Sequence, residues 1–361
     1  MTLFLNNDDV KAVLTMEMTI EVLEEAYQQL ARGEAACPPP LDIDVPGHEA
    51  GRDYRWGQMC GASRVSGYFA IRMKSDVRYE QHYEGVRTSE YYCVRPGRFC
   101  GLIFLTSTRS GEPLALINDG YLQHFRSGAD SAIGSRYMAR EESSVLGVLG
   151  SGGMARSHVE ALRLVRPIRK VLVSSPTRAH REAFASEVRE RYGLEVIVYG
   201  EPRPVYDCDI LSACTDAALP VIRGEWLKEG THVTSVGGSP DDETVRRITR
   251  SLRLGTATAP IGLPHHRVPD ERLIYSAFPE GQGRRKRAHG IIAEDRAVYF
   301  EDLLAGRKKG RLSAADITYS ERGNVQGAQF FSVGSRVYEL ARQRGLGREL
   351  PTEWFLQDIR N

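Results

Sequence analysis

The sequence predicts an α/β protein in which a Rossmann-type doubly wound parallel sheet is joined to a second α/β domain. Between residues 145 and about 258, six short apolar strands alternate with helical segments, which is typical of a parallel sheet covered by helices. A glycine turn follows the first of these strands, and 144 residues of a different pattern precede it. At 361 residues the chain is long enough for two domains.

The segment before the glycine turn predicts helices first and strands second. Residues 5–35 have apolar side chains at helical spacing, with Asp8 and Asp9 in the first turn and Gly33 as the stop. Prolines 38–40 end that pattern, and residues 41–120 read as strands. Residues 123–140 return to helical spacing and lead into the glycine turn, and helices are expected again near 296–306 and 330–343.

The glycine turn predicts a site for a dinucleotide. Residues 150–155, GSGGMA, match the pattern G-x-G-x-x-A between a strand and a helix. The first glycine permits a tight turn, the second lets the backbone approach a diphosphate, and the alanine allows helix and strand to pack closely. The expected cofactor contacts are Gly150, Ser151, Gly152, Gly153 and Met154.

The next strand indicates which dinucleotide binds. Residues 171–174 form the strand, which ends at Ser174. The loop that follows carries Ser175, Thr177 and Arg178 and contains no acidic residue. NAD sites usually place Asp or Glu here, whereas NADP sites use Arg and hydroxyl groups around the 2′-phosphate. The sequence therefore favours NADP(H), with NAD(H) as the alternative. The competing interpretation is that Arg178 is a solvated residue in the first turn of a helix.

Two further loops end strands of the same sheet. Thr215 follows the fourth strand, and Val236 and Gly237 follow the fifth. Loops at the carboxyl ends of parallel strands line the cofactor crevice, so these residues are expected near the nicotinamide. Ordinary turn chemistry is the competing interpretation, because Gly-Gly and Ser-Pro make turns in many settings.

Composition excludes several classes of partner. A net charge of +1 and a pI near 7.7 argue against nucleic acid, and the basic run 284–287 and the PHHR run 264–267 read as surface loops. No window approaches the 18 apolar residues of a membrane span, and the N-terminus lacks a signal-peptide pattern. Six cysteines without metal-ligand spacing indicate reduced thiols in a cytoplasmic protein and no metal site.

Five stretches together resemble the ornithine cyclodeaminase and mu-crystallin family, which includes ketimine reductases and some amino-acid dehydrogenases. They are residues 5–35, the stretch GEPLALINDGYLQHFRSGADSAIGSRYMAR, the GSGGMA turn, EGTHVTSVGG, and QFFSVGSRVYELARQRGLG. The most diagnostic is FRSGADSAIGSRYMAR, directly before the first strand of the parallel sheet. The resemblance covers nearly the whole chain.

The resemblance implies a homodimer and a small α-amino or α-imino acid substrate. The expected substrate-binding and dimerisation domain is 1–125, completed by 318–361, with the Rossmann domain at 126–317. Lys74 matches the family's active-site lysine, and Arg126 matches the arginine that precedes the dinucleotide-binding domain and is also expected to contact the cofactor. Arg55 is the best match for the first carboxylate-binding arginine, with Arg64 as a neighbouring alternative. Ser332, in the C-terminal stretch, is a further expected cofactor contact.

The chemistry of these basic residues suits such a substrate. A carboxylate is planar and anionic, and a guanidinium fork binds it bidentately, while lysine contributes a point charge. Taken singly, each of them could also be a surface ion pair, since the chain has 48 Lys and Arg residues.

Two departures from the family pattern bear on the reaction. Cyclodeaminases have an aspartate where this chain has Ser239, whereas mu-crystallin-like ketimine reductases have serine, so the difference favours reduction. Asp241 and Asp242 follow closely and are alternative carboxylates. Three tyrosines in the centre of an apparent insertion at 76–98 either shape the pocket or pack in a strand: Tyr83, Tyr91 and Tyr92.

The expected function is NAD(P)H-dependent reduction of a ketimine or imino acid to an α-amino acid. Arg55, Lys74 and Arg126 would hold the carboxylate, and Lys74, Ser239 or Asp241 would serve the proton chemistry. The alternatives are an amino-acid dehydrogenase or reductive aminase, an ornithine cyclodeaminase-type lyase with tightly bound NAD, and a non-enzymatic NADP-binding protein.

Overall fold

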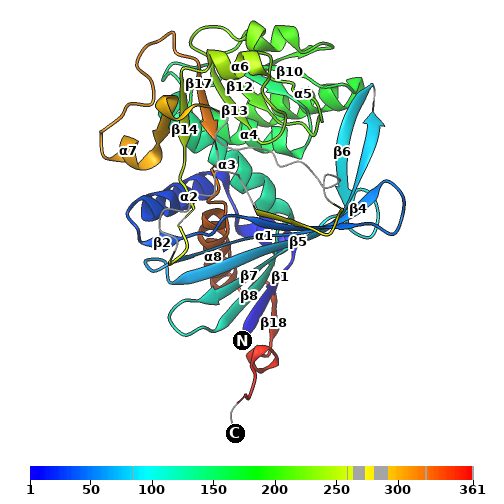
Figure 1. Ribbon diagram of the computed structural model, residues 1–361, viewed down its shortest axis with the longest axis vertical. Helices are drawn as coiled ribbons and strands as arrows, with labels where there is room; N and C mark the ends of the chain where they lie inside the picture. The colour runs from blue at the N-terminus through cyan, green and yellow to red at the C-terminus, as the bar shows by residue number, and fades with distance from the viewer. Residues whose placement is uncertain (84, 258, 263–272, 280–291, 322, 360–361) are drawn as a thin grey trace.

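The computed structural model describes residues 1–83, 85–257, 259–262, 273–279, 292–321 and 323–359, and shows a chain folded around two β-sheets (Figure 1). The surface loops expected at 264–267 and 284–287 lie outside the described residues, as does the side chain of Tyr83. None of the described helices is long and apolar enough to cross a membrane.

The predicted doubly wound parallel sheet is confirmed. Within the described residues it has eight strands, all paired in parallel, in the order β11-β10-β9-β12-β13-β17-β14-β16. The strand order reverses between β9 and β12, which is where ligands bind in open α/β sheets. The strands are β9 (Val145–Leu149), β10 (Lys170–Ser174), β11 (Glu195–Tyr199), β12 (Ile210–Ala213), β13 (His232–Ser235), β14 (Arg250–Arg253), β16 (Ala297–Tyr299) and β17 (Thr318–Glu321).

Apolar clusters cover both faces of this sheet. Alternate residues of β10 divide between them, with Val171 and Val173 in one cluster and Leu172 in the other. Helices α4 (Gly153–Val165) and α5 (Arg178–Tyr192) contribute Val159 and Phe184 to the first cluster. Burial on both faces explains why the strands read as continuous apolar runs in the sequence.

The second sheet has ten strands in the described residues and is mostly antiparallel. Eight of them follow the order β15-β3-β4-β5-β7-β8-β1-β18, while β2 pairs with β4 and β6 pairs with β5 beside this path. Helices α2 (Met16–Ala31) and α8 (Gly327–Gln343) pack against it with α1 (Asn7–Val13) nearby. Its strands are β1 (Thr2–Leu5), β2 (Ala35–Ala36), β3 (Leu41–Pro46), β4 (Arg52–Ser63), β5 (Tyr68–Tyr83), β6 (Val86–Tyr92), β7 (Cys100–Ser107), β8 (Pro113–Asn118), β15 (Leu273–Ser276) and β18 (Arg348–Leu350).

The chain passes between the two sheets more often than the sequence predicts. Strand β17 lies in the parallel sheet, so that sheet extends past the expected boundary at residue 317, and β15 joins the second sheet beside β3. Near 296–306 the expected helix is reduced to α7 (Phe300–Leu304), because residues 297–299 pair with β14. Short strands of mixed polarity such as Thr318–Glu321 carry too weak a pattern to be recognised.

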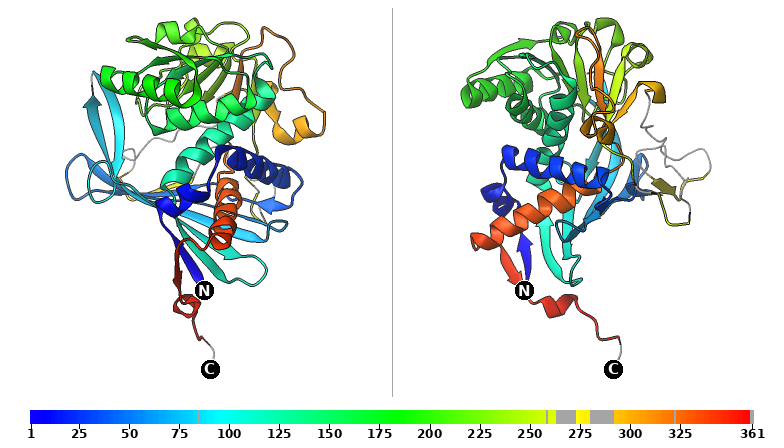
Figure 2. Two further views of the ribbon diagram at one scale, coloured as in Figure 1. Left: turned by 180° about the vertical axis from the view of Figure 1, so that it is seen from behind. Right: turned by 90° about the vertical axis from the view of Figure 1, so that its left-hand side faces the viewer.

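The apparent insertion at 76–98 is a β-hairpin that reaches the parallel sheet's side of the molecule. Strand β6 pairs with the outer half of β5, and the hairpin stands away from the rest of its sheet (Figure 2). Thr88 forms an isolated bridge with Ala217, and the amide of Ala218 donates to the carbonyl of Arg87 at 3.0 Å. The hairpin therefore connects the two halves of the protein beside the loop that follows β12.

Helix α3 (Gly120–Met138) also contacts both halves, and its close contact with α4 is testable. A Cβ at Gly128 would lie 2.6 Å from the carbonyl oxygen of Ser157 in α4. Gly128→Ala should therefore lower the free energy of unfolding by about 1–3 kcal/mol through overpacking, measured by urea denaturation.

Gly334→Ala is the matched control, because Gly334 is also buried within a helix. Its nearest neighbour to a new Cβ is 3.6 Å away, so the substitution should stabilise the protein by up to about 1 kcal/mol through helix propensity. Equal effects of the two substitutions would contradict the close α3–α4 contact.

Candidate active site

The glycine turn is built to bring a ligand onto the start of α4. Gly150 has φ of 110°, and a Cβ there would lie 2.2 Å from the carbonyl oxygen of Cys214, so only glycine fits. Gly152 is the N-cap residue of α4, and a Cβ on it would meet nothing within 4 Å. No side chain caps this helix, so its first N–H groups remain available to an anion. These features fit a dinucleotide diphosphate.

A cavity of about 850 Å³ extends from this turn to strands β4 and β5. On the parallel-sheet side it is lined by Gly152, Gly153, Met154, Thr215, Val236 and Gly237, which are among the predicted cofactor contacts. On the other side it is lined by Arg55 and Lys74, and Arg126 reaches it from α3. The structure thus brings the three predicted carboxylate-binding residues and the glycine turn to one space. Arg64 is exposed at the end of β4 and does not line it.

Strand register places the basic side chains on one face of the second sheet. Arg55 pairs with Asp76, Gly57 with Lys74 and Met59 with Arg72 across β4 and β5. Paired residues share a face, and so do residues two apart along a strand. Arg72 therefore stands beside Lys74, and it also lines the cavity. It has no motif of its own, although the alternation Arg72, Lys74, Asp76 in the sequence marks one strand face.

Each of these cations has a carboxylate partner. Arg55 donates to Asp42 at 2.6 Å, Arg72 donates to Asp119 at 2.6 Å, and Nζ of Lys74 lies 3.2 Å from Asp76. Asp42, Asp76 and Asp119 are all buried. A buried cation keeps its charge only when it is paired in this way, so the acids hold the basic groups in position.

Tyr91, from the hairpin, packs on two of the cations. The centre of its ring lies 5.5 Å from the guanidinium carbon of Arg55 and 5.4 Å from Nζ of Lys74, within cation–π range. Tyr91 lines the cavity, whereas Tyr92 is buried in an edge-to-face contact with Tyr79. Tyr91 therefore lies at the pocket, and Tyr92 packs within the hairpin.

Arg126 is buried and held from several sides. It donates to Gln329 at 2.5 Å and to Gln123 at 2.6 Å, and its guanidinium carbon lies 5.3 Å from the ring centre of Phe330. Arg72 lies 5.9 Å from the same ring centre, so both guanidinium groups are within cation–π range of Phe330.

The cavity carries a positive excess among its described lining residues. Five are basic, namely Lys11, Arg55, Arg72, Lys74 and Arg126, and three are acidic, namely Asp76, Asp119 and Asp216. Five minus three leaves +2 in ionised side chains, which suits anionic ligands. Asp216 lines the cavity with an exposed side chain. The surrounding protein desolvates its carboxyl group and raises its pKa, and the negative charge of Glu90 raises it further.

Three predicted residues near the end of β13 do not line the cavity. Asp241 is the N-cap of α6 (Asp242–Arg247), where it accepts from Thr244 and from the amide of Gly224. These hydrogen bonds outweigh partial desolvation and lower the pKa of Asp241, so it is a structural carboxylate. Ser239 accepts backbone hydrogen bonds from Val221 and Ile222, and Asp242 begins the helix.

Ser332 also lies elsewhere. Its hydroxyl donates to the carbonyl of Ala328 at 2.7 Å, and it lines a separate cavity between α2 and α8.

The loop after β10 lies beside the glycine turn. The hydroxyls of Ser175 and Ser151 are 2.8 Å apart, and Arg178 pairs with Glu182 at the exposed start of α5.

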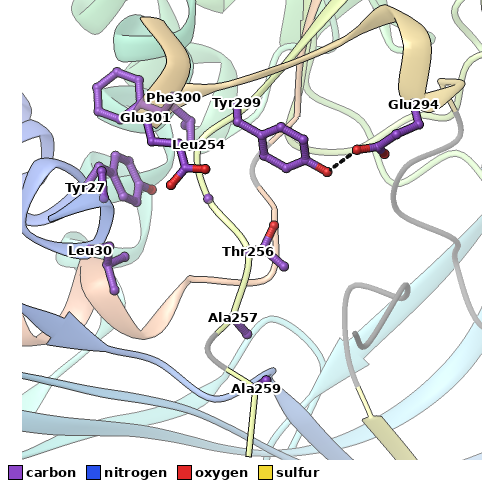
Figure 3. Close-up of a pocket in the computed structure, with 12 residues that line it drawn as sticks. Tyr27, Leu30, Leu254, Thr256, Ala257, Ala259, Glu294, Tyr299, Phe300 and Glu301 are labelled. Atoms are coloured by element: carbon purple, nitrogen blue, oxygen red, sulfur yellow. Dashed lines mark hydrogen bonds between the residues drawn. The ribbon is translucent and has the colours of Figure 1, made fainter. Parts of the chain in front are cut away.

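A further cavity of about 390 Å³ lies between α2 and α7 (Figure 3). Its lining includes Glu294 and Glu301 and no basic residue among those described. Tyr299 donates to Glu294 at 2.6 Å. This cavity has the wrong charge for a carboxylate or a diphosphate, and no predicted site residue opens onto it. Within the described residues, no group of three His, Cys, Asp or Glu side chains is placed to hold a metal ion.

Comparison with known proteins settles the family. A profile of the ornithine cyclodeaminase/mu-crystallin family matches residues 1–342. The chain belongs to this family.

Its relatives include enzymes named for an amino acid or an imino acid. Alanine dehydrogenase of Archaeoglobus fulgidus is 26% identical over 97% of this chain and 98% of its own. The Δ1-pyrroline-2-carboxylate reductase of Bacillus cereus is 28% identical over 69% of this chain and 74% of its own. The structure of Δ1-pyrroline-2-carboxylate reductase from Thermococcus litoralis, in complex with NADH and L-proline, superposes with a TM-score of 0.73 at 25% identity, covering 97% of this chain and all of the other.

Proposed function

We propose that this protein reduces an imino acid to an α-amino acid with a nicotinamide dinucleotide. The observation that carries the proposal is the single cavity in which the uncapped start of α4 faces the basic side chains of β4 and β5. One end suits a diphosphate and the other suits a carboxylate, so both reactants fit one space. The imino-acid reductases and the alanine dehydrogenase among the relatives support the same reaction class.

The basic side chains would orient the substrate. Arg55 and Arg72 offer guanidinium forks, and Lys74 offers a point charge between them on the strand face. Arg126 lines the same cavity from α3. Fixing the carboxylate fixes the neighbouring imine carbon, and such positioning supplies much of a bimolecular reaction's acceleration. When bound, the reduced nicotinamide supplies the hydride.

Asp216 is the acid in the cavity best suited to protonate the imine nitrogen. Asp76 and Asp119 are engaged by Lys74 and Arg72, whereas Asp216 forms no ion pair within the described residues. Its raised pKa means that a larger fraction of Asp216 keeps its proton toward neutral pH than of an ordinary aspartate. Of the residues that the sequence offers for this role, Lys74 lines the cavity as a cation paired with Asp76, whereas Ser239 and Asp241 do not line it.

The loop after β10 favours NADP(H). Ser175, Thr177 and Arg178 stand where the adenosine ribose is expected, without an acidic side chain to bind a 2′-hydroxyl. Arg181 adds a second guanidinium to this loop, where it donates to the carbonyls of Ser175 and Pro176 at 2.9 Å. The homodimer implied by the resemblance is part of the proposal and can be checked by light scattering.

A second candidate function is an amino-acid dehydrogenase or reductive aminase. The same cavity would hold an α-keto acid with ammonia or an amine, and the alanine dehydrogenase relative supports this alternative. A cyclodeaminase is less well supported, because Ser239 stands where cyclodeaminases carry an aspartate.

A substrate panel separates these functions. Purified protein would be given NADPH or NADH with Δ1-pyrroline-2-carboxylate, Δ1-piperideine-2-carboxylate, or pyruvate or glyoxylate with methylamine or ammonia. We expect the dinucleotide to be oxidised with a cyclic ketimine. Oxidation only with a keto acid and ammonia would establish the dehydrogenase instead, and ammonia release from ornithine without net oxidation would establish the lyase. No turnover with any of these would contradict the proposal.

Asp216→Asn tests the proton donor. An acid that must carry its proton makes kcat/KM fall as the pH rises through its pKa. We expect Asp216→Asn to lower kcat about 10²- to 10⁴-fold and to remove that decline, with KM changing little. A pH–rate profile that keeps its wild-type shape in the variant would exclude Asp216 as the donor.

Arg178→Ala tests the cofactor preference. It should lower kcat/KM for NADPH about tenfold or more and leave kcat/KM for NADH nearly unchanged, because only NADPH carries the 2′-phosphate. Arg246→Ala is the matched control. Arg246 is also exposed, and it pairs with Glu243 within α6, in the same half of the protein. A wild-type protein that prefers NADH, or equal losses for both dinucleotides, would contradict the NADP assignment.

A further inference from the structure

Helices α3 and α4 pack in a register that repeats turn by turn. Gly128 of α3 lies against Ser157 of α4, as described above. One turn earlier in both helices, four residues back, His124 lies against Gly153. A Cβ on Gly153 would lie 2.7 Å from Cε1 and 2.9 Å from Nε2 of His124. The close contact at Gly128 therefore brings the imidazole to the first turn of α4.

His124 explains a glycine that the dinucleotide pattern does not require. The pattern uses Gly150 for the turn, Gly152 for the approach of a diphosphate and Ala155 for packing. Gly153 occupies a position where the pattern accepts any residue, and its φ is not positive, so its conformation does not demand glycine. The space that a side chain would need at position 153 is taken by the imidazole of His124.

The imidazole opens onto the same cavity as the glycine turn. His124 lines it together with Gly152, Gly153 and Met154. Within the described residues, neither of its ring nitrogens makes a hydrogen bond, so one N–H donor and one acceptor remain for a ligand.

The surroundings keep this imidazole neutral in the protein alone. Partial burial lowers the pKa of His124, the charge of Asp119 raises it, and that of Arg126 lowers it again. Asp119 is itself engaged by Arg72, and the uncapped N–H groups of α4 add a partial positive charge beside the ring. A bound anion would reverse this balance and favour the imidazolium form.

We infer that His124 is a ligand of the cofactor's diphosphate, donating a ring N–H to a phosphate oxygen at the start of α4, and that dinucleotide binding takes up a proton there. The inference rests on the proposed dinucleotide binding. It assigns to α3 a direct part in holding the cofactor, because His124 and the start of α4 line the same cavity.

Binding of ADP-ribose tests this without any chemistry at the nicotinamide. Titration calorimetry in two buffers of different ionisation enthalpy would give the dissociation constant and the protons taken up. Wild-type protein should take up part of a proton near neutral pH, and its affinity should fall as the pH rises through the pKa of His124 in the complex. NADH, followed by its fluorescence, should behave in the same way.

Three substitutions separate the loss of the ring N–H donor from the loss of the titrating group in ADP-ribose binding. His124→Ala should weaken ADP-ribose binding about tenfold, since a hydrogen bond to a charged group is lost. His124→Asn keeps an N–H donor that does not titrate, so it should recover most of the affinity but take up no proton. His48→Asn is the matched control, because His48 is exposed in the loop between β3 and β4, and it should behave as wild type.

Gly153→Ala provides an independent check on the geometry. The new Cβ should displace the imidazole and weaken binding, and adding His124→Ala should cost little more, because the same contact is already lost. The inference is overturned if His124→Ala binds ADP-ribose as tightly as wild type, or if the proton uptake persists in it. Failure of wild-type protein to bind ADP-ribose, NADH and NADPH would instead overturn the proposed function.

Discussion

Helix α3 lies against α4 with Gly128 facing the carbonyl oxygen of Ser157, and the two halves of the cavity take their spacing from this contact. The same helix carries Arg126 into the basic group and His124 to the glycine turn. It also packs on α2, where Asp130 accepts a buried hydrogen bond from Tyr27. Because α3 contacts strands β13 and β17 of the parallel sheet and helices α2 and α8 beside the second sheet, a shift of this helix would move the basic side chains relative to the start of α4.

The electrostatics of the cavity follow from how the cations are held. Burying Arg55 and Arg72 is costly unless each is paired, and Asp42 and Asp119 supply the pairing. The lining still carries more positive than negative side chains, so an anionic substrate finds fixed charges that need no rearrangement. The hairpin adds Tyr91 over two of these cations and contacts the loop after β12 through Thr88.

Local signals in the sequence predict the nucleotide-binding half well. The glycine turn, the strands around it and the hydroxyl-rich loop after β10 all depend on neighbours within a few residues, and the structure places them as expected. The resemblance locates Lys74, Arg55 and Arg126, which the structure brings to one cavity, although their roles stay predictions.

Contacts between distant segments are beyond such signals. Ser239 and Asp241 follow the expected strand, but the chain turns so that Asp241 caps α6 instead of facing the cavity. Arg72, Asp216 and His124 enter the site only through sheet register and helix packing. An alternating run such as Arg72, Lys74, Asp76 would indicate a shared strand face, but nothing in the sequence shows which way that face points.

The central claim is that one cavity holds the dinucleotide and an imino acid so that hydride passes to the carbon beside the carboxylate. The most direct test is to supply NADPH or NADH deuterated at the transferred position together with Δ1-pyrroline-2-carboxylate, and to analyse the product by mass spectrometry and NMR. The account predicts proline with one deuterium at the α-carbon and in a single configuration. Proline without deuterium, or deuterium lost to solvent with no proline formed, would contradict it.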